Sequence, residues 1–264
     1  MLVRVLLAAA VAIATASTAL GREGGAGAGH AATRPDARRL LQRFAEDAAL
    51  VPGGWVEAQY VYGNLPDGSR HFAGPLIAFR LATNVEAGLR FGFLDVESDG
   101  GPDGAGLSDI DLYAKYRFPG IGPHRLALGG LVKAATGDED QGLGTGETDV
   151  EVFIAYRGTL PGVILVANAG VRFNGDPEPP LRSTDDSLLL GGAVLLPATR
   201  RLTFIVEATY ETERIEGTDD DGRLTVGAQV LGRKLRGGFR VGVGAPLTDG
   251  APDAEIIAGA FITY

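Results

Sequence analysis

Apolar and polar residues alternate along most of the chain between residues 55 and 264. The alternation is clearest over 85–93 and 110–118, where every second residue is apolar and the residues between are mostly charged residues or glycine. A period of two residues is typical of a β-strand with one apolar and one polar face. The pattern predicts twelve strands, at 55–62, 72–82, 84–95, 108–118, 124–134, 148–157, 162–173, 187–196, 200–211, 223–232, 235–245 and 254–264.

The connections between these strands alternate in length. Short turns are expected at 83, 119–123, 158–161, 197–199 and 233–234, and longer loops at 63–71, 96–107, 135–147, 174–186, 212–222 and 246–253. Transmembrane barrels have short periplasmic turns and longer external loops, and an even strand count returns both termini to the periplasm. The sequence therefore predicts an all-β fold, a transmembrane antiparallel up-and-down β-barrel over residues 55–264, in the outer membrane of a Gram-negative cell.

The apolar face of each strand must point outward, because only an apolar exterior is stable in hydrocarbon. With that register the outward aromatic residues gather at two heights. General strand preference explains why aromatic residues are present but not why they are sorted in this way. Two aromatic girdles are expected: Tyr62, Phe93, Phe173 and Tyr210 at the external ends, and Tyr116, Phe118, Tyr156 and Tyr264 at the periplasmic ends.

The same register turns the charged positions into the lumen. The candidate lumen-lining residues are Arg90, Asp111, Lys115, Arg117, Lys133, Glu151, Arg172, Glu207 and Arg240. Charges in a narrow bore must pair or be hydrated, so these residues form either a structural network of salt bridges or a lining that sets selectivity. One wall of the bore is expected to be apolar, at Ile164, Val166, Leu189, Leu195 and Ile205.

The chain before the barrel divides into three parts. Residues 1–20 are typical of a signal peptide for export, since Arg4 precedes an apolar run over 5–13 that is too short to span a bilayer. Residues 21–32 form a linker rich in glycine and alanine. Residues 33–51 are predicted to be an amphipathic helix, with Leu40, Leu41 and Phe44 among the residues of its apolar face.

This helix face is a candidate cover for the apolar wall of the lumen, which would make residues 33–51 a plug. The polar face carries Arg38, Arg39 and Arg43, which could meet the carboxylates opposite. Two other arrangements remain open at this point. The apolar wall could be a track for a hydrophobic solute, or the helix could lie on the periplasmic membrane surface.

Composition excludes several classes of function. The chain has no cysteine, and its net charge of −9 argues against a nucleic-acid partner. Its three histidines, His30, His71 and His124, lack catalytic or ligand spacing, so we expect no enzyme activity, no metal site and no cofactor. The remaining expected partners are outer-membrane lipid and a small solute.

The last residues of the chain carry a further signal. Residues 259–264 resemble the C-terminal signal that the barrel assembly machinery reads, with Gly259, Ile262 and the terminal Tyr264 at the expected offsets. The machinery is therefore an expected partner.

Three stretches, 108–118, 134–138 and 142–150, resemble the outer-membrane barrels of the "MetA-pathway of phenol degradation" or transporter-like family. The resemblance implies passage of small molecules, including aromatic or hydrophobic ones. The sequence thus favours a porin-like passive conduit or binding pore that serves transport. The alternative is a non-conducting structural or adhesion barrel.

Overall fold

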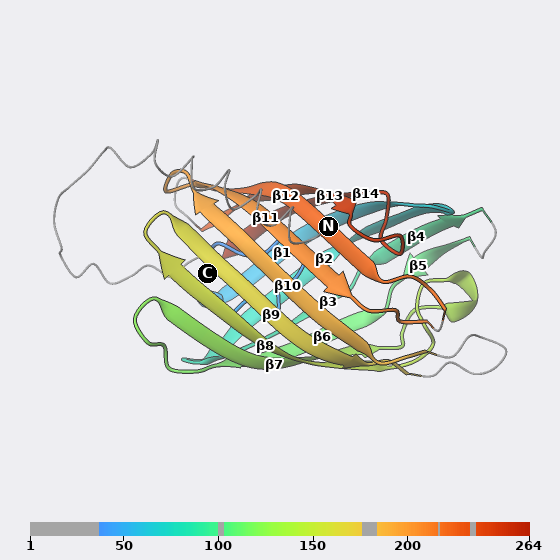
Figure 1. Ribbon diagram of the computed structural model, residues 1–264, viewed down its shortest axis with the longest axis horizontal. Helices are drawn as coiled ribbons and strands as arrows, with labels where there is room; N and C mark the ends of the chain where they lie inside the picture. The colour runs from blue at the N-terminus through green and yellow to red at the C-terminus, as the bar shows by residue number, and fades with distance from the viewer. Residues whose placement is uncertain (1–36, 100–102, 176–183, 216, 233–235) are drawn as a thin grey trace. The chain divides into compact units, whose positions relative to one another are not determined.

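The computed structural model describes residues 37–99, 103–175, 184–215, 217–232 and 236–264. They form one antiparallel sheet that closes into a barrel (Figure 1). Its strands are β1 (Gly54–Leu65), β2 (Gly68–Ala82), β3 (Val85–Arg90), β4 (Phe93–Ser98), β5 (Gly104–Leu107), β6 (Ile110–Arg117), β7 (His124–Ala134), β8 (Asp149–Leu160), β9 (Val163–Phe173), β10 (Ser187–Pro197), β11 (Leu202–Glu211), β12 (Asp221–Leu231), β13 (Gly237–Pro246) and β14 (Ala254–Thr263).

The barrel closes because β1 pairs with both β14 and β2. β3 and β4 follow one another along β2, and β5 and β6 lie beside them in the same way. Counting each of these pairs as one interrupted strand, the fourteen segments of the sheet form twelve barrel strands. The predicted fold and strand number are therefore confirmed. In the described residues, no helix is long and apolar enough to cross a membrane.

The first interruption lies opposite Pro75 of β2. Phe91 donates its backbone N–H to the Pro75 carbonyl at 3.3 Å, but Pro75 has no N–H with which to complete the pair. The second interruption is a β-bulge. Three residue steps lead from Arg90 to Phe93, whereas four lead from Leu107 to Asp111 on the partner strand. Because of this extra residue, odd-numbered residues of β6 such as Asp111 face the lumen, whereas in β5 the odd-numbered Leu107 faces outward.

One predicted loop is wrong. Residues 63–71 continue β1 to Leu65 and begin β2 at Gly68, so only residues 66 and 67 connect the two strands. Outside the hydrocarbon layer the outward face of a strand need not be apolar, so the alternation that identifies a strand fades there. The other connections at this end are longer, at 99–103, 135–148, 174–186, 212–220 and 247–253, and those at the opposite end are 83–84, 118–123, 161–162, 198–201 and 232–236. We call these ends the loop end and the turn end.

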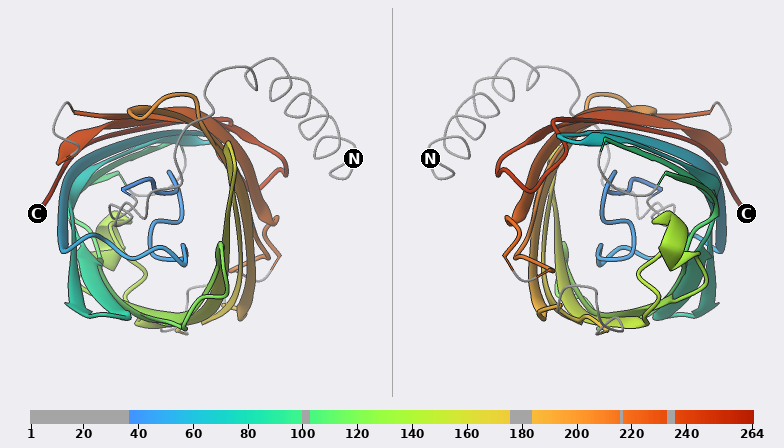
Figure 2. Two further views of the ribbon diagram at one scale, coloured as in Figure 1. Left: turned by 90° about the vertical axis from the view of Figure 1, so that its left-hand side faces the viewer. Right: turned by 90° about the vertical axis from the view of Figure 1, so that its right-hand side faces the viewer.

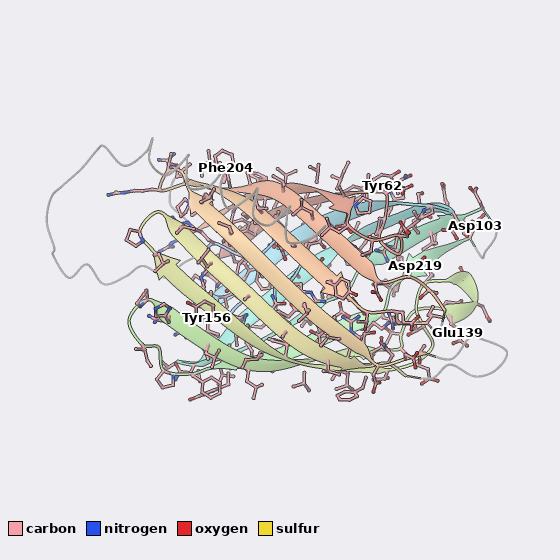
Figure 3. All side chains as sticks on the ribbon, viewed as in Figure 1. Tyr62, Asp103, Glu139, Tyr156, Phe204 and Asp219 are labelled. Carbon is pink, nitrogen blue, oxygen red and sulfur yellow. The ribbon has the colours of Figure 1, made fainter. Side chains whose placement is uncertain are left out.

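The outward face of the barrel is apolar. Side chains that point away from the lumen at mid-height are well exposed, among them Leu112, Leu128, Val152, Ile154, Leu190, Val226 and Val241. The acidic residues Asp103, Glu139 and Asp219 gather at the loop end, and Tyr156 and Phe204 lie toward the turn end (Figure 3). An apolar exterior is the surface of a membrane-spanning barrel, and the longer connections at the loop end are typical of the external side.

Residues 37–51 lie inside the barrel and are called the internal segment. The two end-on views of the barrel place this blue trace within the ring of strands (Figure 2). Its backbone forms bends and turns, so the prediction of a helix is wrong for these residues. Residues 33–36 of that prediction, the signal peptide at 1–20 and the linker at 21–32 lie outside the described residues.

Candidate functional site: the barrel lumen

The internal segment packs its leucines against one wall of the lumen. Leu40 and Leu41 are almost fully buried in a cluster with Ile164, Val166, Ala193, Leu195, Ile205 and Ile257. Four of these are residues that the sequence assigns to an apolar wall. The fifth, Leu189, is fully buried on the same inward register of β10.

Phe44 of the internal segment turns toward a different wall. Its ring lies 5.3 Å from that of Trp55, which stacks on Phe261 at 4.1 Å between ring centroids. Ala45, Ala48 and Val51 belong to this second cluster. The apolar residues of the segment thus face two walls. One helical face could not reach both, which is one reason why the segment is irregular.

Glu207 of β11 binds the internal segment through three successive backbone amides. Its carboxylate accepts the N–H groups of Leu41 at 2.7 Å, Gln42 at 3.1 Å and Arg43 at 3.0 Å. In a helix these groups would donate to carbonyls four residues earlier. Because the backbone hydrogen bonds go to a strand side chain instead, the segment is held in place without regular structure.

Lys115 and Glu86 hold the next part of the segment. Lys115 Nζ donates to the carbonyl oxygens of Ala45 at 3.0 Å and Asp47 at 2.8 Å, and lies 3.0 Å from Glu86 Oε1. The other Glu86 oxygen accepts the Val51 N–H at 2.5 Å. Both charged side chains are fully buried, so removing either one would leave the other as an uncompensated buried charge and destabilise the barrel.

Arg240 of β13 joins the segment to β1. Its Nε lies 2.6 Å from Glu57 Oε1, and its Nη1 donates to the Leu40 carbonyl. The second Glu57 oxygen accepts the indole N–H of Trp55 at 3.0 Å. Three residues that the sequence places in the lumen, Lys115, Glu207 and Arg240, are therefore ligands of the internal segment.

The other predicted lumen residues also face inward, and most lie nearer the loop end. They pair across strands: Arg90 with Asp111 at 2.7 Å, Lys133 with Asp149 at 2.8 Å, and Arg172 with Glu151 at 2.9 Å. Arg117 is half-buried at the end of β6 and forms no ion pair with the residues that the structure describes. The charged residues thus form two groups, one around the internal segment and one between the segment and the loop end.

A cavity of about 520 Å³ lies in the lumen on the loop side of the internal segment. Residues 41–46 of the segment form part of its lining, and residues 142–145 of the β7–β8 connection form another part. Leu143 is buried there, because this connection folds inward around the short 3-10 helix η1 (Glu139–Gln141). The volume is in the range of small-molecule sites. The arrangement can enclose a small solute between the segment and the external mouth.

The sequence analysis missed several residues of the cavity, and three of them form one wall. Arg70 and Phe72 of β2 and Gln59 of β1 face the cavity, but Arg70 fell in the stretch predicted as a loop. Carrying the alternation of β2 back past residue 72 would have placed Arg70 on the inward face. Among the described residues, no group of three or more His, Asp or Glu side chains could hold a metal ion.

No family model matches the sequence, and no curated protein matches it. Solved structures with a similar fold include an outer membrane channel from Pseudomonas putida F1, which is 14% identical with a TM-score of 0.65 over 83% of this chain and 98% of that one. The KdgM porin in complex with disordered oligogalacturonate is 14% identical and the NanC porin 8% identical, each with a TM-score of 0.55 over 80% of this chain and 99% of the other. At these identities the likeness shows the fold, which is that of porin-like outer-membrane barrels.

Proposed function

We propose that the protein is a passive outer-membrane channel for small molecules, with the internal segment as a plug between the cavity and the periplasmic end. The observation that carries this proposal is the cavity of about 520 Å³ inside a closed barrel. A barrel with only a structural role has no need of a space that opens toward the external side. Twelve strands give a bore between that of a filled barrel and that of a wide porin, so one short segment is enough to obstruct it.

The lining of the cavity supports solutes with an apolar part. Val61, Phe72, Leu76, Leu94 and Leu131 contribute apolar surface beside the charged pairs. The resemblance of residues 108–118, 134–138 and 142–150 to a phenol-degradation family is consistent with aromatic solutes. We therefore infer that the channel favours small molecules that combine a flat apolar body with a polar group.

A non-conducting structural barrel is the second candidate, and one observation favours it. The internal segment is tied to the wall by many buried contacts, including the three amides on Glu207. Such a segment could stay in place permanently. The two candidates differ in whether the segment ever leaves the lumen.

Planar-bilayer recording of the full chain and of a variant lacking residues 37–51 separates them. A channel with a plug predicts small or rare openings for the full chain and large steady conductance for the deletion variant. The matched control deletes residues 21–32, which should leave the conductance of the full chain unchanged. If neither the full chain nor a folded deletion variant conducts, the channel proposal is wrong and the structural barrel is favoured.

A further inference from the structure

One wall of the cavity has an ordered series of side chains. On the paired strands β1 and β2, Gln59 lies opposite Gly74, Val61 opposite Phe72, and Gly63 opposite Arg70. All six positions face inward, and Gln59, Val61, Arg70 and Phe72 line the cavity. From the turn side toward the loop end, the wall therefore presents an amide, an apolar pair and a guanidinium.

Among the described residues that line the cavity, every cation but one is paired with a carboxylate. Arg43, Arg90, Lys133, Arg172, Arg214 and Arg223 each lie within 4.0 Å of at least one carboxylate. Arg70 has neither an ion pair nor a hydrogen bond with the described residues. Asp221 and Glu255 are near enough to attract its charge, but both of these bind Arg223 instead.

A guanidinium cannot lose its proton in a protein, so Arg70 stays charged. It is half-buried and lines the cavity, and its N–H donors have no acceptor among the residues that the structure describes. Arginine presents these donors as a planar fork that matches the two oxygens of a carboxylate. The geometry of these donors thus suits a planar anion.

The rest of the wall suits an apolar body behind that anion. Phe72 lies between Arg70 and Gln59 in the register, and the Arg90 guanidinium is 5.4 Å from the centre of the Phe72 ring. At the far end Gln59 is 8% exposed, and its buried Oε1 has no hydrogen-bond partner in the described part of the chain. A buried amide oxygen without a partner is costly unless a ligand supplies a donor.

We propose that the cavity is a binding site for a small aromatic carboxylate, whose carboxylate binds Arg70 while its ring packs on Phe72 and Val61. Gln59 accepts a hydrogen bond from a hydroxyl at the opposite end of the ring. The site rests on the proposed channel function, because the channel is what gives the solute access to the cavity. Small aromatic carboxylates are then the class of solute that the channel takes up.

The test is a calorimetric titration of the full-length barrel in detergent with 4-hydroxybenzoate, phenol and phosphate. Hydroxybenzoate should bind, while phenol, which lacks the carboxylate, and phosphate, which lacks the ring, should bind at least about tenfold more weakly. Arg70→Met should weaken hydroxybenzoate binding by roughly ten- to a hundredfold. This substitution leaves neither nearby carboxylate unpaired, since Asp221 and Glu255 both remain in ion pairs with Arg223.

Arg201→Met is the matched control, because Arg201 is exposed at the turn end and outside the cavity, and it should bind as the wild type does. If Arg70→Met does not fold, Arg70→Lys replaces it, and loss of the planar fork should still weaken binding severalfold. The proposed site is wrong if hydroxybenzoate does not bind, or if a folded Arg70 variant binds it as tightly as the wild type does. It is also wrong if phosphate binds as tightly as hydroxybenzoate. The titration needs no current, so a barrel that binds without conducting refutes only the channel, and one that conducts without binding refutes only this site.

Discussion

The carboxylate of Glu207 lies 2.7 Å from the backbone nitrogen of Leu41, a residue 166 positions earlier in the chain. This contact joins the internal segment to the middle of β11. It is one of three that the same carboxylate makes with consecutive amides, so this side chain binds the segment at more backbone positions than a single hydrogen bond would allow.

Glu207→Ala should therefore loosen the segment. The three amides lose their acceptor, and each buried donor left without a partner costs about 1–3 kcal/mol, although these costs are not additive. We expect faster hydrogen exchange at residues 41–43 and more frequent channel openings in a bilayer. Asp253→Asn, in an exposed loop, removes a negative charge without touching the segment and should change neither. Unchanged exchange in Glu207→Ala would contradict the role given to this carboxylate.

A disulfide should show whether the segment moves during conduction. A Cβ at Gly242 would lie 2.8 Å from Leu41 Cδ1, so Leu41→Cys with Gly242→Cys places two cysteines in side-chain contact, where oxidation can join them. The chain has no other cysteine that could compete. We expect the oxidised double variant to be closed and the reduced one to conduct as the wild type does. Equal conductance in both states would mean that the segment need not move.

The buried pair of Arg240 and Glu57 gives a prediction about stability. The side chains are 0% and 1% exposed, so replacing only Arg240 by Met leaves a buried carboxylate without its cation. That change should lower the free energy of unfolding by about 3–5 kcal/mol. The double variant Arg240→Met with Glu57→Gln should recover part of the loss in urea unfolding from liposomes. A double variant less stable than the single one would show that the pair is not the main cause.

The outward register can be tested at Leu112. This side chain is 48% exposed on the lipid face and lies opposite Leu89 and Val132. Leu112→Arg should cost about 2–4 kcal/mol of barrel stability in a bilayer. Thr209→Arg, which points into the cavity, is the control and should insert normally. Gly88 is unsuitable as a control, because a Cβ there would lie 2.4 Å from the Tyr113 ring.

Tyr264 should matter more for assembly in cells than for the finished barrel. Its backbone exchanges hydrogen bonds with Gly54 at the seam, but its side chain is 65% exposed on the outer face. If the barrel assembly machinery reads Gly259, Ile262 and Tyr264, then Tyr264→Ala should reduce the folded barrel in cells while refolding into liposomes proceeds normally. Tyr156→Ala, at the same end of the barrel, is the control. Equal loss in both assays would point to stability instead.

The strands could be predicted because each carries its own signal. Leu89 and Leu112 face lipid, Arg90 and Asp111 face the lumen, and that difference repeats every second residue whatever the partner strand is. The signal weakens where the surroundings change. Residues 63–71 extend beyond the apolar band, so Arg70 was assigned to a loop and its place in the lumen was missed.

The internal segment was harder to predict because its conformation depends on residues far away in the sequence. The spacing of Leu40, Leu41 and Phe44 fits a helix, and nothing nearby argues against it. Its hydrogen-bond partners include Glu207 and Gln229, more than 160 residues later. The apolar contacts of the leucines with the wall could be anticipated from the register alone, whereas the path of the backbone could not.

These distant partners also set the order in which the molecule is completed. Residues 37–51 come before every strand, yet their acceptors and donors include Glu207 on β11, Gln229 on β12, Arg240 on β13 and Glu255 on β14. Contacts of such long sequence separation form late in folding. Residues 37–51, which are synthesised before the strands, must therefore wait until the final strands are in place. During that interval an assembling barrel has an empty bore and an unattached amino-terminal tail.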